Sequence, residues 1–353
     1  MANKSSKVYT GIDVFKLIAA VMIVLLHTIE TTNYYVCLIK EVFTRFAVPF
    51  FFIVSGFFLY NGLDRASNKG EYFRKYEKNI LIIFGVWAII IYSPFVIYEY
   101  LINNAGESVI KIIAILIRRI LVIGPGPYWY LVALFWAAIF IYFCYTRNKD
   151  NVLLVGIIIG FCLQIAYTSF KGILSEIVFF NYFFKVIYGI FSWEYNVFMY
   201  GIPFMGIGYL LKKKRFYVKS KTALIFLVIC TILSVIEYSL PQIFPNIFWE
   251  ENRIFIAFIG QAIAYFLLAQ NMDFSISKTE SLTIRQLSSF IYFSHVILLY
   301  NILNPILTKY TELSTYGPYM ILPKLLIVLL VCVGLFWPIK KINNRYLNIL
   351  ING

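Results

Sequence analysis

Two ionisable residues lie in one apolar segment near the start of the chain. Residues 11–28 read GIDVFKLIAAVMIVLLHT, with Lys16 near the beginning and His27 near the end. On an α-helix, the stretch from Lys16 to His27 advances about 1100°, only about 20° beyond three full turns, so the two side chains share one face. The helix rises about 16 Å between them. Ionisable residues within a membrane helix usually face the bundle interior or a wet cavity. The spacing therefore predicts a cation and an imidazole along one functional path.

An imidazole in such a place is suited to acid–base chemistry. Histidine changes its charge near neutral pH and can take a proton from one group and return it to another. Glu30 lies about one turn beyond His27, where a carboxylate can orient the ring. The residues also fit plainer roles: Lys16 reaching the headgroup region, His27 bonding to another helix, and Glu30 in water at the helix end. The spacing leaves both sets of roles open.

The composition indicates a membrane protein. Of the 353 residues, 61% are hydrophobic and 14% are charged, whereas soluble proteins average about half apolar and a quarter charged. The formal net charge of +14 does not indicate a nucleic-acid partner, because the basic residues form short clusters between apolar runs. The five cysteines are scattered without CxxC spacing, which argues against a disulfide framework or a zinc site.

Apolar runs of about 20 residues, long enough to cross a bilayer, recur along the chain. They are continuously apolar rather than alternating, and only helices and closed barrels satisfy their backbone groups in lipid. We therefore expect an all-α fold: a polytopic membrane bundle of about ten transmembrane helices, forming one domain over residues 1–353. The expected spans are residues 12–33, 43–61, 79–102, 128–146, 151–169, 195–211, 222–240, 254–271, 286–307 and 320–339.

The distribution of Lys and Arg orients the expected bundle. With the N-terminus in the cytoplasm, most of the 31 basic residues fall on the cytoplasmic side, including KKKRFYVKSK at 212–221. The positive-inside rule therefore predicts that both termini are cytoplasmic. Residues 108–126 and 170–194 are apolar or aromatic but contain charges, and the first segment also contains a Gly-Pro break. We expect amphipathic or re-entrant segments there, on the outer side.

The segment with Lys16 and His27 resembles the first helix of the acyltransferase-3 family of integral membrane acyltransferases. The signature of that helix is an Arg or Lys, ten residues and a His, which this segment matches. Further segments resemble later parts of the family in the expected order, so the likeness covers nearly the whole chain. They are RFAVPFFFIVSGFFLY (45–60), EYFRKYEKNILIIF (71–84), PYWYLVALF (127–135), IPFMGIGYLLKKK (202–214) and IYFSHVILL (291–299). GIDVFKLIAA (11–20) is also similar to the membrane half of the serine racemases found in vancomycin resistance.

The resemblance implies a membrane O-acyltransferase. Family members move an acyl group, commonly acetyl, from cytoplasmic acyl-CoA to a hydroxyl of a cell-surface carbohydrate or other envelope molecule. Lys16 is then expected to hold the phosphates of acetyl-CoA by charge-assisted hydrogen bonds. The residues expected to assist it are Arg74, Lys75 and Lys78. The family more often has Arg at position 16, and Lys lacks the bidentate fork of Arg.

At the other end of the path, His27 is the catalytic residue that the resemblance implies. As a general base it would take the proton of the acceptor hydroxyl and return it to the leaving thiolate. An acyl-histidine intermediate is the alternative. Glu30 would orient the imidazole, and no metal is required.

Three further residues are candidates for acceptor binding. Arg45 begins the second expected span, Trp129 lies in an aromatic cluster, and His295 lies in the ninth span. Each has a structural alternative. Arg45 fits an anchor at the membrane interface, and Trp129 fits an aromatic belt there. In the functional interpretation, the Trp129 ring stacks on a sugar of the acceptor. His295 fits a hydrogen-bonded link between helices.

A transporter or uptake module for a small polar solute such as L-serine is the alternative function. Polar groups inside a bundle fit it equally well, but the chain shows no paired inverted halves or matched broken helices of the kind many secondary transporters have. We therefore expect an acyltransferase of the bacterial cytoplasmic membrane. Its expected partners are the lipid bilayer, acyl-CoA and a glycan or other envelope acceptor.

Overall fold

The computed structural model describes residues 8–29, 31, 33–91, 108–124, 126–192, 195–244, 256–310, 318–342, 344 and 347–351. Every element of regular structure in these ranges is a helix, which confirms the expected all-α fold. The α-helices are α1 (Thr10–Thr28), α2 (Tyr34–Thr44), α3 (Ala47–Arg65), α4 (Lys69–Ile91), α6 (Val109–Arg118), α7 (Trp129–Thr146), α8 (Asp150–Tyr167), α9 (Lys171–Ser175), α10 (Val178–Phe191), α11 (Ile202–Lys213), α12 (Ser220–Ile243), α13 (Ile256–Asn271), α14 (Lys278–Val296), α15 (Asn304–Tyr310), α16 (Ile321–Ile342) and α17 (Asn348–Ile351). The short π- and 3₁₀-helices are η1 (Arg119–Ile123), η2 (Gly126–Tyr128), η3 (Val197–Gly201), η4 (Ile297–Leu303) and η5 (Pro318–Met320).

Seven helical segments of the described residues are long and apolar enough to cross a membrane. Shorter apolar helices, α10 and α13, accompany them. Each of the ten expected spans overlaps a helix, so the polytopic bundle is confirmed, although seven rather than ten segments have full spanning length. The seven are Thr10–Thr28, Tyr34–Arg65, Gly126–Thr146, Asp150–Tyr167, Ser220–Ile243, Lys278–Lys309 and Pro318–Ile342.

Some helix boundaries differ from the expected ones. α1 ends at Thr28 rather than at residue 33, because Asn33 caps a new helix. The side-chain oxygen of Asn33 accepts hydrogen bonds from the backbone N–H groups of Tyr35 and Val36, at 3.1 and 3.2 Å. α4 begins at Lys69, ten residues before the expected span. The two segments expected to be amphipathic or re-entrant contain the helices α6, α9 and α10.

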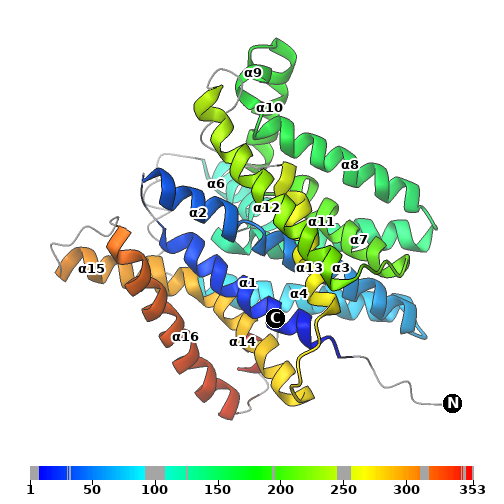
Figure 1. Ribbon diagram of the computed structural model, residues 1–353, viewed down its shortest axis with the longest axis vertical. Coiled ribbons are helices and arrows are strands. Elements are labelled where there is room, and N and C mark those ends of the chain that lie inside the picture. Colours follow the sequence, from blue (N-terminus) through cyan, green and yellow to red (C-terminus); the bar gives the residue numbers. More distant parts are fainter. Residues whose placement is uncertain are drawn as a thin grey trace.

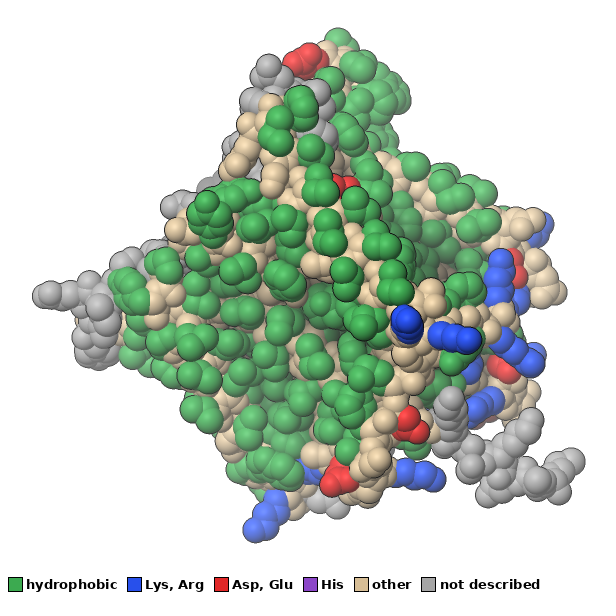
Figure 2. Space-filling view, in the orientation of Figure 1, with side chains coloured by type: hydrophobic (Ala, Val, Ile, Leu, Met, Phe, Trp, Pro, Cys, Tyr) green, Lys and Arg blue, Asp and Glu red, His purple; other side chains and the backbone are tan. Residues whose placement is uncertain are grey.

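The outward surface of the bundle is apolar. On α12, Ile225, Ile229 and Ile232 are each at least half exposed. Figure 2 shows hydrophobic side chains over most of one face, with Lys and Arg gathered along its right and lower edges. Such a surface is unfavourable in water and is matched by the hydrocarbon interior of a bilayer. The chain is therefore a multi-pass membrane protein.

Glycines allow α3 and α11 to pack at very short distance. A Cβ atom at Gly56 would lie 1.9 Å from the backbone oxygen of Met205, and one at Gly208 would lie 1.9 Å from that of Ile53. Small residues of this kind permit close helix contacts in membranes, where packing drives association. The contact fixes the position of α3, which forms part of the site described below.

α1 contacts α2, α3, α13, α14 and α16, and it runs beside α14 (Figure 1). At one end of this pair, the Ser281 hydroxyl donates to Asp13 at 2.6 Å. At the other end, the ring centroids of His27 and His295 are 5.2 Å apart. The two contacts are the same number of residues apart on both helices. The helices are therefore parallel and in register over about 21 Å.

Candidate active site

A cavity of about 310 Å³, here called the first cavity, lies beside Lys16. Its polar side chains other than tyrosines come from four helices: Asp13 and Lys16 from α1, Ser55 from α3, Asn79 from α4, and Arg285 and Ser289 from α14. Apolar and aromatic side chains form much of the remaining wall. A few convergent polar groups in a mostly apolar cavity are typical of a ligand-binding site.

The first cavity has an excess of positive charge. The Asp13 carboxylate pairs with Arg285, whose Nε lies 3.1 Å from Oδ1, and it also accepts the hydrogen bond from Ser281. The Lys16 ammonium makes no direct hydrogen bond or ion pair with any described residue. One carboxylate thus faces two cations. The remaining positive charge can bind an anionic group such as a phosphate through charge-assisted hydrogen bonds.

The basic residues expected to assist Lys16 lie elsewhere. Arg74, Lys75 and Lys78 line a separate surface cavity of about 400 Å³ at the start of α4. Other residues of the same helix line the first cavity, namely Tyr76, Asn79, Ile80 and Ile83. The structure therefore brings Arg285, rather than these three residues, into the cavity of Lys16.

A second cavity, of about 370 Å³, lies beside His27. It brings together three residues that the sequence analysis proposed, His27, Arg45 and Trp129. Tyr195 and Tyr300 add phenolic groups to its wall. One cavity is therefore lined by the imidazole, the guanidinium and the indole, although these groups come from different parts of the chain.

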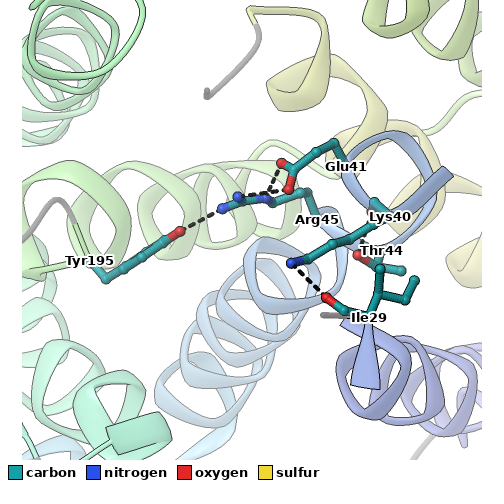
Figure 3. Close-up of polar contacts among 6 residues, drawn as sticks. All are labelled: Ile29, Lys40, Glu41, Thr44, Arg45 and Tyr195. Carbon is teal, nitrogen blue, oxygen red and sulfur yellow. Dashed lines mark hydrogen bonds and ion pairs between the residues drawn. The ribbon is translucent and has the colours of Figure 1, made fainter. Parts of the chain in front are cut away.

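Arg45 is held in a fixed orientation at the wall of the second cavity (Figure 3). Its Nε and Nη2 bond to the two carboxylate oxygens of Glu41, at 2.5 and 3.0 Å, and Nη1 donates to the hydroxyl of Tyr195 at 2.5 Å. The carboxylate offsets the guanidinium charge, so Arg45 presents oriented donors rather than a free cation. Nearby, Lys40 donates to the backbone oxygen of Ile29 at 3.2 Å, which ties α2 to the end of α1.

His27 lies between a phenol and a second imidazole. The hydroxyl of Tyr300 lies 3.5 Å from Nδ1 of His27 and donates to its backbone oxygen at 3.3 Å. The ring of His295 lies on another side, 5.2 Å away between centroids. Glu30, the expected orienting carboxylate, lies outside the described residues. The described neighbours that can orient His27 are therefore Tyr300 and His295.

His295 is fully buried and does not line the second cavity. Its Nδ1 lies 2.6 Å from the backbone oxygen of Tyr292 and 3.2 Å from that of Ile291. Among the acceptor-binding candidates, His295 is thus the one that lies behind the cavity wall. Both oxygens belong to the helix of His295 itself, α14, so these bonds are not the link between helices that the structural alternative for His295 expected.

Tyr292 lines both cavities. Its ring packs against those of Phe51 and Tyr130, at 5.5 and 5.4 Å between centroids. Its hydroxyl donates to the backbone oxygen of Pro127 at 3.1 Å. An aromatic layer therefore stands between the two cavities, which lie one after the other along α1.

The two cavities differ in the functional groups of their side chains. One has ammonium and guanidinium groups, and the other has an imidazole with phenols and an indole. In the part of the chain that the structure describes, no group of three or more His, Cys, Asp or Glu side chains is arranged to hold a metal ion.

Several residues of the cavities were missed by the sequence analysis. Asp13 lies three residues before Lys16, a spacing that places both on one side of a helix, so the signal was present in the first motif. Arg285 lies on the helix of His295, but nothing local indicates that it turns toward Lys16. Tyr195 and Tyr300 carry no signal that distinguishes them from the other tyrosines of the chain.

The fold and these cavities define a multi-pass membrane protein with two cavities beside one central helix, one lined by Lys16 and Arg285 and the other by His27. The family model of an acyltransferase domain matches residues 9–341. The chain therefore belongs to the acyltransferase-3 family.

Curated relatives of the chain are amino-acid racemases of Enterococcus faecalis. One is 30% identical over 235 residues, which cover 63% of this chain and 31% of the racemase. Another is 26% identical over 206 residues, which cover 52% of this chain and 26% of that racemase. The chain thus matches less than a third of the length of either protein. No solved structure shows a significant match to the chain.

Proposed function

We propose that the protein transfers an acyl group, acetyl in the simplest case, from cytoplasmic acyl-CoA to a hydroxyl of a cell-surface carbohydrate or other envelope molecule. It would act as a single domain in the bacterial cytoplasmic membrane, with both termini in the cytoplasm. The observation that carries this proposal is the arrangement of Lys16 and His27 on α1. Each lines its own cavity, and Tyr292 lines both.

The first cavity is proposed to bind the donor. Lys16 offers an ammonium without a direct ion pair among the described residues, and Arg285 offers a guanidinium that Asp13 holds in place. Phosphate groups of acyl-CoA are suited to both. The exposed cluster of Arg74, Lys75 and Lys78 would attract the same anion toward the entrance by its field rather than by contact.

The second cavity is proposed to hold the acceptor and the reacting atoms. His27 takes the proton of the acceptor hydroxyl, the oxygen attacks the thioester carbonyl, and the C–S bond breaks. The proton then passes to the thiolate, which leaves as free coenzyme A. Transfer through an acyl-histidine uses the same ring and gives the same products. Arg45 and Trp129 would orient the acceptor, with Trp129 as a stacking surface.

The experiment uses the purified protein in lipid vesicles with labelled acetyl-CoA and a cell-envelope extract. We expect thioester consumption that depends on the extract, with the label entering an envelope component. The control is the same mixture with vesicles that lack the protein. A wild-type protein that binds acetyl-CoA but transfers no label to any extract component would contradict the proposal.

Uptake of a small polar solute such as L-serine is the second candidate. The observation that favours it is the similarity to amino-acid racemases. In the same vesicles, labelled L-serine that accumulates inside, without any thioester turnover, would support transport. The residues of the two cavities would then belong to a solute path. Transfer of the acetyl label without serine accumulation would exclude this alternative.

A further inference from the structure

The contacts of the buried His295 imidazole define which of its two ring nitrogens carries the hydrogen. A backbone oxygen only accepts, so Nδ1, at 2.6 Å from the oxygen of Tyr292, must be the nitrogen that bears the hydrogen. The ring is fully buried, and no described acidic side chain contacts it, so the neutral form is the one that this environment favours. In neutral imidazole the other nitrogen is an acceptor. Nε2 of His295 therefore carries a lone pair.

That lone pair has no hydrogen-bond partner among the described residues. Leaving a buried acceptor unsatisfied costs about 1–3 kcal/mol, and such groups in native proteins call for an explanation. The nearest imidazole is that of His27, 5.2 Å away between centroids, with an angle of 37° between the ring planes. A hydrogen bond of about 3 Å between two ring nitrogens fits this separation after a small rotation of His27.

The helix next to His295 has unusual geometry. η4, which follows α14 directly, is a π-helix, a form that occurs often at functional sites. On an α-helix, positions 295 and 300 would be about 140° apart around the axis. The wider π-helical turn reduces this angle. As a result, His295 and Tyr300 both contact His27, and His27 lies between them.

We propose that His295 is the positioning residue for His27: its Nε2 accepts a hydrogen bond from a ring N–H of His27 and thereby fixes the tautomer of the catalytic imidazole. This inference rests on the proposed function. Once one nitrogen of His27 donates to His295, the opposite nitrogen keeps the lone pair that removes the acceptor proton. When His27 gains that proton, His295 stabilises the imidazolium by the same hydrogen bond. A third group that orients a catalytic base is a recurrent arrangement in acyl transfer.

The proton count is complete without any further reactant. The acceptor proton goes to the free nitrogen of His27 and then to the sulfur of the leaving coenzyme A. The proton shared with His295 stays on His27 throughout, so His295 neither gains nor loses one. This role requires no contact between His295 and the donor or the acceptor, and His295 does not line the second cavity.

Two substitutions separate this role from a purely structural one. His295→Asn keeps a donor at the position of Nδ1 and loses the group at Nε2, whereas His295→Gln keeps a polar group at the position of Nε2 and loses the bond at Nδ1. A structural role requires the Nδ1 contact, so it predicts that the Asn variant is the more active. A positioning role predicts the reverse order of activity.

The measurements are kcat and the KM for acetyl-CoA in lipid, with the melting temperature of each variant. For His295→Asn we expect kcat to fall about 10- to 100-fold, because a positioned base contributes about 10²–10⁴ in rate and only part of this is lost. The KM and the melting temperature should stay close to those of the wild type. We expect His295→Gln to retain more activity, despite a lower melting temperature. Activity of the Asn variant equal to or above that of the Gln variant would overturn the proposal.

A second readout uses the wild-type protein and needs no turnover. The chain has only two histidines, so ¹⁵N-histidine labelling gives two imidazole signals in a solid-state NMR spectrum, assigned with the His295→Gln variant. We expect His27 to be a single neutral tautomer with a hydrogen-bonded N–H. A mixture of tautomers at His27 in the wild type would contradict the proposal. A single tautomer in a protein that transfers no acetyl group would instead refute the proposed function and leave the pairing intact.

Discussion

The guanidinium of Arg285 on α14 is paired with the carboxylate of Asp13 on α1, at 3.1 Å between Nε and Oδ1. The second oxygen of that carboxylate accepts from Ser281 at 2.6 Å. Asp13 is thus engaged by α14, and Lys16, one turn farther along α1, lines the first cavity without a direct ion pair to a described residue. The parallel pairing of the two helices therefore brings two cations and one carboxylate to the first cavity, where we propose that the donor binds.

Substitution of Lys16 tests the donor end. We expect Lys16→Ala to raise the KM for acetyl-CoA about tenfold, because it removes one charge-assisted hydrogen bond of about 1.5 kcal/mol. The kcat should change little. Lys16→Arg should restore binding, because it returns the charge and adds a bidentate fork. The matched control is Lys214→Ala, at an exposed lysine outside both cavities. An unchanged KM in Lys16→Ala would leave Lys16 as a residue that only reaches the headgroups.

The Asp13 and Arg285 pair predicts a pattern of stabilities. Arg285→Ala leaves a carboxylate that is 4% exposed without its counter-ion. Because the Arg285 side chain is itself 45% exposed, we expect a loss of about 1–3 kcal/mol rather than the larger cost of breaking a fully buried pair. Asp13→Asn combined with Arg285→Ala should recover part of that loss. Thermal unfolding in detergent measures both, and a double variant less stable than Arg285→Ala would refute the pairing argument.

At the acceptor end, Arg45 should affect one substrate only. Arg45→Ala removes the donors that face the second cavity and leaves Glu41 unpaired, so we expect the amount of envelope extract needed for half-maximal rate to rise about tenfold. The KM for acetyl-CoA should not change, because Arg45 does not line the first cavity. Tyr195→Phe, which removes only one bond to the guanidinium, should have a smaller effect of the same kind. A rise in the KM for acetyl-CoA alone would contradict this assignment.

The close contact between α3 and α11 predicts a packing effect with a built-in control. Gly56→Ala places a methyl group 1.9 Å from the backbone oxygen of Met205, so the helices must separate. We expect a loss of about 1–3 kcal/mol, as for other overpacked sites. Gly85→Ala meets nothing within 4 Å and should be neutral or stabilising by about 0.5–1 kcal/mol. Equal melting temperatures for both variants would show that the α3–α11 contact is looser than described.

The helices and the shared face of Lys16 and His27 could be predicted because both depend on local regularity. A continuous apolar run is sufficient to predict a membrane helix, and eleven residues return nearly to the same side of it. The end of α1 was missed by five residues. That end is set by the new helix that Asn33 caps, whereas the expected span was drawn from the apolar pattern alone.

Arg285 and Tyr300 could not be predicted as neighbours of Lys16 and His27, because they come from helical segments far away in the sequence. Arg74 and its neighbours were grouped with Lys16 since both lie at the same expected membrane boundary, but a boundary does not indicate which way a side chain turns. The π-helical segment at η4 was equally hidden. Its residues, ILLYNIL, are compatible with an ordinary α-helix, so nothing local in the sequence indicates the π-helical form.

The most direct test of the account is acetyl transfer by the His27→Ala variant. Purified wild type, His27→Ala and the control Ile18→Ala, at an exposed position of the same helix, are compared in lipid with labelled acetyl-CoA and envelope extract. The account predicts that Ile18→Ala transfers the label like wild type, whereas His27→Ala binds acetyl-CoA normally but loses about 10²–10⁴-fold in rate. Transfer by His27→Ala at the wild-type rate would contradict the assignment of His27 as the catalytic base.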